Sequence, residues 1–199
     1  MLRSVLTTIL AAALLTTSAT SVSAAEGAPA GNTFDDHVQL VDTLREIGVR
    51  VYFNPYVCAP EGGRKSSGFY VSQSRKMAIC QDKGKYDGEV VKFTDNDLDT
   101  IRHESQHVIQ DCIDGIGDNS LVNMFPVAPT KGSISLSQFV AGSGLSSLTL
   151  MNIFSAYSQA GGDNEVIGLE FEAFAVANSI TAAGIKQGVV RFCSVNNKN

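Results

Sequence analysis

The segment 94–113 carries the strongest secondary-structure signal in the chain and limits what the rest can fold into. Thr94 is placed as a helix N-cap, with the acidic Asp97 three residues later. Gly115 and Gly117 follow the expected end of the helix. Apolar or small residues recur at three- and four-residue spacing; they are Leu98, Ile101, Ser105, Val108 and Cys112. We predict a helix that packs one side on the core while another side lines a cleft.

Residues 1–25 have the pattern of a cleaved secretory signal. A basic start at Arg3 is followed by an almost continuous apolar run and then by small residues. The apolar run is too short to cross a bilayer as a helix, and a retained N-terminal membrane anchor is the alternative reading. Cleavage after Ala24 or Ala25 would leave residues 26–199, which suffice for one domain. We therefore predict a secreted or periplasmic protein.

Composition narrows the classes of partner. The chain is 44% hydrophobic and 18% charged, so it can bury a core. Its formal net charge is −5, and lysine and arginine do not cluster. A mildly acidic surface argues against nucleic acid or an anionic membrane as the main partner. We expect a soluble monomer that acts on a peptide or protein substrate.

Four cysteines follow the signal: Cys58, Cys80, Cys112 and Cys193. An even number in an exported chain predicts two disulfides. The sequence allows three pairings, of which we favour Cys58–Cys80 and Cys112–Cys193. A zinc site made of all four is disfavoured, because no two of them form a CxxC pair.

The remaining elements predict an α+β fold, with a small N-terminal antiparallel sheet and a mainly helical C-terminal half. Residues 69–71 and 76–80 are expected to pair as antiparallel strands. Residues 115–135 contain Gly, Asn and Pro and predict an irregular crossing loop. Further helices are expected over 34–47, about 145–160 and about 165–183, and further strands over 49–53 and 189–192.

The predicted central helix contains His103-Glu104-Ser105-Gln106-His107, which matches the pattern H-E-x-x-H. Two histidines four residues apart lie on one helix face, so both imidazoles can reach one ion. Zinc accepts neutral histidine nitrogen, and a catalytic zinc site keeps one position for water. Glu104 lies beside the ion, where it can act as general base toward a zinc-activated water.

Zinc needs a third protein ligand. A third histidine six residues after His107 is absent, because Ile113 stands there, and we expect His37 to be solvated or capping. A glutamate from a later helix is the other common solution, and Glu170 and Glu172 are the candidates. They lie about 200° apart on a helix, so only one can face the metal.

These residues resemble the gluzincins, zincin-type metallopeptidases with HExxH on one helix and a glutamate on the next. In that group the glutamate often begins an E-x-x-A pattern, which fits both Glu170 and Glu172; we prefer Glu170 slightly. The resemblance covers roughly residues 94–114 and 165–178. It implies a zincin-like fold and a zinc cofactor. The glutamine at Gln110, three residues after the second histidine, also resembles several bacterial HExxH families.

The chain departs from the gluzincin pattern in the residue that orients a histidine ligand. An acidic residue often stands four places after the glutamate, but here Phe174 or Val176 does. Asp99, Asp111 or Asp114 are possible replacements.

The leading hypothesis is an exported zinc metallopeptidase with His103, His107 and Glu170 (or Glu172) as ligands and Glu104 as general base. Peptide hydrolysis also needs a group that stabilises the oxyanion, for which Tyr157 is the candidate; a packed core tyrosine is the alternative. The competing hypotheses are a secreted zinc-binding domain without turnover, and a disulfide-stabilised domain in which HESQH is accidental.

Overall fold

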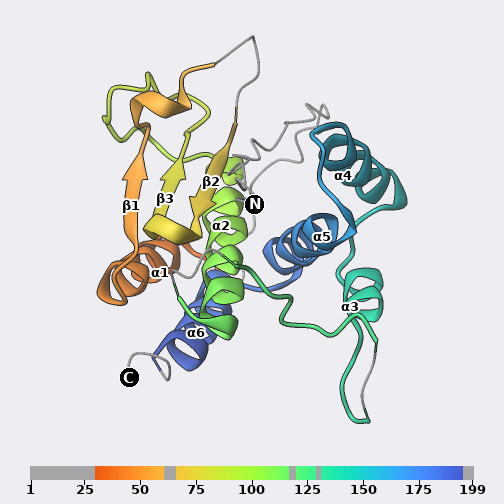
Figure 1. Ribbon diagram of the computed structural model, residues 1–199. Coiled ribbons are helices and arrows are strands. Elements are labelled where there is room, and N and C mark those ends of the chain that lie inside the picture. The colour runs from red at the N-terminus through yellow and green to blue at the C-terminus, as the bar shows by residue number, and fades with distance from the viewer. Residues whose placement is uncertain (1–29, 61–65, 117–119, 129–130, 195–199) are drawn as a thin grey trace, which may run out of the picture.

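The computed structural model describes residues 30–60, 66–116, 120–128 and 131–194. The segment 1–25, predicted as a signal, lies outside these residues. The elements in chain order are α1 (Phe34–Glu46), β1 (Arg50–Phe53), β2 (Gly68–Val71), β3 (Lys76–Ile79), α2 (Asp95–Asp114), α3 (Leu136–Gly142), α4 (Ser147–Gln159), α5 (Asn164–Ser179) and α6 (Ala182–Cys193). The fold is α+β, with a small N-terminal sheet and a mainly helical C-terminal half, as the sequence predicts (Figure 1).

The sheet is mixed rather than antiparallel. Its strand order is β1-β3-β2; β2 and β3 pair antiparallel as predicted, but β1 runs parallel to β3. Met77, Ala78 and Ile79 of β3 are buried, whereas β1 is only half-buried. The most buried strand takes the central place, and the long connection from β1 to β3 gives the chain room for a parallel pairing.

Helix α2 lies at the centre of the molecule (Figure 1). The sheet and α1 pack on one side of it, α5 on another, and α6 packs against both α1 and α2. The hydroxyl of Thr94 accepts from the backbone N–H of Asp97, whose carboxylate accepts from the Thr94 N–H, so the predicted capping box begins the helix. Its buried apolar residues Ile101, Val108, Ile109 and Cys112 belong to the main core.

One prediction for the C-terminal half is wrong, and one helix was not predicted. Residues 189–192 lie in helix α6, not in a strand, because Ala182, Ile185, Val189 and Cys193 form a buried helical stripe. Burial against α1 and α2 outweighs the β-preference of the adjacent valines. Helix α3 lies between the predicted loop 115–135 and the predicted helix 145–160, where no element was expected. It begins at a capping box of Ser135 with Gln138.

Both favoured disulfides are present. Cys58 bonds Cys80, which joins the turn after β1 to the residue after β3. Cys112 bonds Cys193, which joins the last turn of α2 to the end of α6. Two disulfides indicate an oxidising, extracellular type of compartment.

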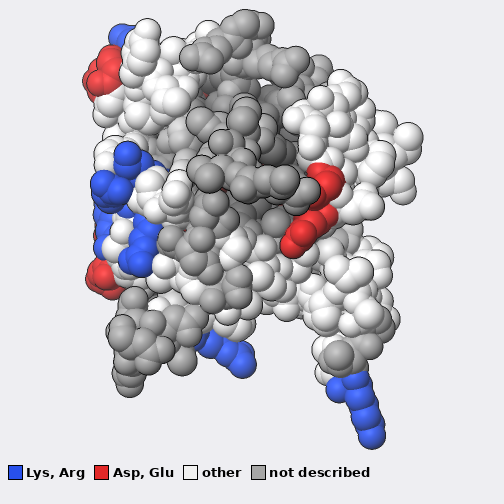
Figure 2. All heavy atoms as spheres, in the orientation of Figure 1, with Lys and Arg blue, Asp and Glu red and all other residues white. Residues whose placement is uncertain are grey.

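Charge is unevenly distributed over the chain. Residues 132–162, which include α3 and α4, contain no charged residue. Figure 2 shows a largely white surface over these two helices. No helix within the described ranges is long and apolar enough to cross a membrane.

Candidate metal centre

Helix α2 contributes two side chains, His103 and His107, to the candidate metal centre. His103 and His107 lie one turn apart, with their rings edge to face and their centroids 4.9 Å apart. Their Nε2 atoms are 3.2 Å apart, and both side chains are buried. The central helix thus presents two ring nitrogens to one point, as the spacing in sequence predicts.

Helix α5 brings Glu170 to the same point. Its Oε2 lies 3.3 Å from His103 Nε2, and its Oε1 lies 3.5 Å from His107 Nε2. His103, His107 and Glu170 offer ligand atoms that all lie within 4.8 Å of one another, so the group could hold a metal ion. The choice that the sequence left open between Glu170 and Glu172 is thereby decided in favour of Glu170 as the carboxylate of this group.

The spacing of these atoms fits a tetrahedral ion. Nitrogen and oxygen ligands about 2.0–2.2 Å from zinc lie roughly 3.3–3.5 Å from one another in a tetrahedral site. The two Nε2 atoms here are 3.2 Å apart, and the nearest carboxylate oxygen of Glu170 to each is 3.3 Å from His103 (Oε2) and 3.5 Å from His107 (Oε1), close to that spacing. In addition, Glu170 Oε2 is buried and has no hydrogen-bond partner within the described part of the chain. Buried carboxylate oxygens are normally paired, so a cation would complete this group.

The charges of the group influence one another. Burial alone would raise the pKa of Glu170, but His107 and His103 outweigh it and hold the pKa below its ordinary range. Burial lowers the pKa of His107, but the negative charges of Glu170 and Glu104 outweigh it and raise the pKa to about 9. The metal-free centre therefore holds a proton at neutral pH where a metal ion would bind, and binding would release that proton.

Glu104 lies between this group and the sheet. It is 4% exposed, and its Cγ lies close to Gly68 at the start of β2. Burial raises the pKa of its carboxyl, Glu170 raises it further, and the two histidines oppose the rise. A buried carboxyl group with a raised pKa beside a candidate metal site has the properties of a general base.

Tyr157 of α4 reaches the centre from the opposite side. It is buried, as a core tyrosine would be, and it packs in a small cluster with Ile153 and Ile167. Burial raises its pKa strongly, and the charge of Glu170 and a hydrogen bond to that carboxylate raise it further. The phenol therefore remains a hydrogen-bond donor whose hydroxyl is directed at the centre.

Glu172 is completely buried and does not join the three ligand candidates. Its carboxylate accepts hydrogen bonds from the side chains of Gln106 and Gln110 and from the backbone N–H groups of Met124 and Phe125. The glutamate that faces away from the candidate metal group is thus paired within the protein. Sequence reasoning found Gln110 by its spacing but gave it no role, because its partners come from elements distant in sequence.

His37 is neither solvated nor a ligand candidate. It is 1% exposed; its Nδ1 donates to the carbonyl of Thr33, and its Nε2 accepts from Arg102. Of the two expectations, solvated or capping, the solvated one is wrong because α1 packs this residue against α2, whereas the ring does bond Thr33, the N-cap residue of α1. Arg102 is the residue before His103, so its side chain leaves α2 about 100° around the helix from the ligand histidine.

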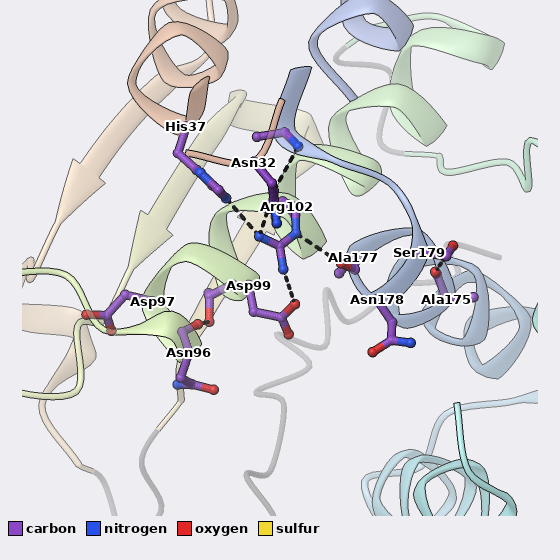
Figure 3. A network of polar contacts seen from close by, with 12 residues as sticks. Asn32, His37, Asn96, Asp97, Asp99, Arg102, Ala175, Ala177, Asn178 and Ser179 are labelled. Atoms are coloured by element: carbon purple, nitrogen blue, oxygen red, sulfur yellow. Dashed lines mark hydrogen bonds and ion pairs between the residues drawn. The ribbon is translucent and has the colours of Figure 1, made fainter. Parts of the chain in front are cut away.

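Arg102 is the hub of a separate polar cluster (Figure 3). Besides His37, its guanidinium donates to the Ala177 carbonyl, the Asn32 side chain and the Asp99 carboxylate. This cluster joins the residues before α1 to α2 and α5.

Two of the three aspartates suggested as a replacement for the gluzincin acidic residue have partners outside the centre. Asp99 pairs with Arg102, and Asp111 accepts a hydrogen bond from the hydroxyl of Tyr70. The side chain of Asp114 lies outside the described part of the structure. Gln110 contacts a histidine of the centre, since its Oε1 lies 2.7 Å from His107 Nδ1.

The fold and the centre define an α+β domain with a buried His-His-Glu group that could hold a metal ion. The chain belongs to the family described as Domain of unknown function (DUF8637), whose family model matches residues 15–141. The match includes the whole of α2 and ends before α5, which carries Glu170. No curated protein and no solved structure matches the chain.

Proposed function

We propose that this protein is an exported zinc metallopeptidase, with zinc held by His103, His107 and Glu170. The observation that carries the proposal is the convergence of the two Nε2 atoms, 3.2 Å apart, with the carboxylate of Glu170, whose Oε2 lies 3.3 Å from His103 and whose Oε1 lies 3.5 Å from His107. Glu104 is next to His103 in sequence and beside the group in space.

The donor set favours zinc over other ions. Two imidazole nitrogens and one carboxylate oxygen form a set used by catalytic zinc sites, whereas calcium and magnesium prefer oxygen donors alone. The spacing fits a tetrahedral ion with short bonds. Zinc would supply a Lewis acid that makes a water molecule acidic near neutral pH.

Two residues of the chain would assist the reaction: Glu104 would transfer the proton, and Tyr157 would stabilise the negative charge that develops on the carbonyl oxygen. Glu104 accepts a proton from the water while the oxygen of that water forms a bond to the scissile carbonyl carbon. When the carbon–nitrogen bond breaks, Glu104 gives the proton to the leaving amine. The hydroxyl of Tyr157 donates a hydrogen bond to the developing oxyanion, turning to it from Glu170. Water is consumed, and one peptide gives an amine and a carboxylic acid.

Export is supported by two independent features. The segment 1–25 has the pattern of a cleaved signal, and both disulfides form within the folded chain. We therefore place the enzyme outside the cytoplasm, secreted or periplasmic, as a monomer acting on peptides or proteins.

The first test is the zinc content of the purified protein after dialysis, measured by elemental analysis. We expect about one zinc per chain, as in other sites with three protein ligands, and none in His107→Ala or Glu170→Ala. Hydrolysis of a mixed peptide library should then fall by about 10²–10⁴-fold in Glu104→Gln, which retains zinc but lacks a proton acceptor.

The outcomes separate the competing functions. Zinc bound without any hydrolysis by the wild type would indicate the zinc-binding domain without turnover. Failure to take up zinc even from excess would remove the enzyme hypothesis and make HESQH accidental.

A further inference from the structure

Glu172 forms the most fully bonded polar group beside the proposed metal site. Its Oε1 accepts from Gln106 Nε2 at 2.7 Å, Gln110 Nε2 at 2.9 Å and the Met124 N–H at 3.1 Å. Its Oε2 accepts from the Phe125 N–H at 2.9 Å. A buried carboxylate with several N–H donors is held firmly in place, so Glu172 is a fixed point between α5, α2 and the loop 122–125.

This fixed carboxylate determines which way the Gln110 amide points. Gln110 Nε2 donates to Glu172 Oε1 and also to the backbone carbonyl of Leu169, 3.1 Å away. Both neighbours are acceptors, so the amide nitrogen must face them and the amide oxygen must face the other way. That oxygen lies 2.7 Å from His107 Nδ1.

The oriented oxygen in turn fixes the ring of His107. A carbonyl oxygen can only accept, so Nδ1 must carry a hydrogen and donate it. With Nδ1 occupied in this way, Nε2, the atom that faces His103 and Glu170, is the ring nitrogen that can offer its lone pair to an ion. Histidine ligands of metals commonly donate their second ring N–H to such a partner.

We propose that Gln110 is a positioning residue for the metal site, held by Glu172, and that the two together take the place of the acidic residue missing from the gluzincin pattern. This inference rests on the proposed function, because it assigns Gln110 a role toward zinc bound at His107. Neither residue would touch the substrate.

The chain contains a matched control for a test. Gln106 is also buried on α2 and also donates to Glu172 Oε1, but among the described residues the hydrogen bond to the His107 ring comes from Gln110 and not from the Gln106 side chain. Gln106→Leu and Gln110→Leu each remove one donor from Glu172. Only Gln110→Leu removes the acceptor from His107.

The experiment measures zinc affinity by competition with a chromophoric chelator, and the His107 Nδ1–H signal by nuclear magnetic resonance of the metal-free protein. We expect zinc to bind about 10–100-fold more weakly in Gln110→Leu. Gln106→Leu should stay within about twofold of the wild type, the scatter of an independent site. A slowly exchanging Nδ1–H signal should be present in the wild type and in Gln106→Leu, and absent from Gln110→Leu.

A third variant separates positioning from folding. Gln110→Glu keeps an acceptor for His107 Nδ1–H but places a second carboxylate against Glu172. We expect it to lose stability and still bind zinc more tightly than Gln110→Leu.

Equal loss of zinc affinity in Gln106→Leu and Gln110→Leu would overturn the inference while leaving the metal site in place. So would zinc affinity in Gln110→Glu as low as in Gln110→Leu. A wild type that shows the Nδ1–H signal but binds no zinc would instead overturn the proposed function, and with it the role of Gln110 in metal binding.

Discussion

Two polar clusters, one partly buried and one buried, begin at adjacent residues of α2 and differ in one respect. Arg102 donates to a carboxylate, a backbone carbonyl, a side-chain amide and a histidine, so its cluster is complete. His103 belongs to a cluster in which three potential ligand atoms face one another. There, His103 Nδ1 and Glu170 Oε2 have no hydrogen-bond partner among the described residues.

This difference suggests that the Arg102 cluster stabilises the fold, whereas the His103 cluster binds an ion. The Arg102 cluster satisfies its donors and acceptors by itself and joins α1, α2 and α5, as a structural network does. The cluster of His103, His107 and Glu170 leaves buried polar atoms unmatched, which lowers stability unless an ion is added. One cluster should therefore set the stability of the metal-free protein, and the other should make stability depend on zinc.

The largest expected effect is the stabilisation by zinc. At free zinc about 1,000 times the dissociation constant, the free energy of unfolding should rise by about 4 kcal/mol. Urea unfolding with zinc and with chelator would measure it. His107→Ala should show no rise, whereas Arg102→Leu should keep it in full. A rise in His107→Ala equal to that of the wild type would contradict this division.

Arg102→Leu is expected to lower the free energy of unfolding while leaving zinc binding almost unchanged. This change leaves the carbonyl of Ala177 and Nε2 of His37 without a donor. We expect a loss of about 3 kcal/mol in the free energy of unfolding, as for other broken buried networks. Zinc affinity should change by no more than about twofold. Loss of zinc together with stability would show that the two clusters are one.

A smaller effect is expected where the sheet meets α2. A Cβ at Gly68 would lie 2.7 Å from Thr100 Cγ2, 2.9 Å from the Ala78 carbonyl oxygen and 3.2 Å from Glu104 Cγ. The backbone oxygen cannot yield, so Gly68→Ala should cost about 1–3 kcal/mol in the free energy of unfolding and displace Glu104, which would lower the proposed peptidase activity. The control is Gly142→Ala in α3, where a Cβ would meet nothing within 4 Å. Equal losses in both variants would contradict the explanation.

The smallest effect concerns pH. Burial lowers the pKa of His37, the charge of Arg102 adds to this, and the hydrogen bond to Thr33 and the charges of Asp36 and Asp99 oppose it. The folded protein thus holds His37 neutral where the unfolded chain takes up a proton. Stability is then fully present above pH 6.5 and falls as the pH falls below it, by at most about 1.4 kcal/mol per pH unit.

The matched measurement compares wild type and His37→Gln in urea at pH 7.5 and 5.5. Acidic groups elsewhere affect both proteins alike. The wild type should lose more stability than the variant between these two values; identical losses would show that His37 does not contribute.

Local sequence signals predicted the central helix and the two histidines because the information lies within one or two turns. The Thr94 capping box, the apolar stripe and the four-residue spacing of His103 and His107 depend only on neighbouring residues. The same holds for the antiparallel pairing of 68–71 with 76–79, whose strands are joined by a short turn.

Signals that compete with tertiary packing were less reliable. Residues 189–192 are rich in valine and were expected as a strand, yet packing against α1 and α2 makes them helical. The parallel pairing of β1 with β3 could not be derived from the strands themselves, because it depends on which strand is buried on both sides.

By itself, the sequence determined that one helix carries two histidines and a glutamate base candidate, and it left two glutamates as candidates for the third ligand. Only the tertiary structure decided that Glu170 meets the histidines while Glu172 binds Gln106, Gln110 and the loop 122–125. The reason is physical. Periodicity gives the angle between two side chains on one helix, but the partner of each depends on how α5 is oriented against α2, which is set by contacts distant in sequence.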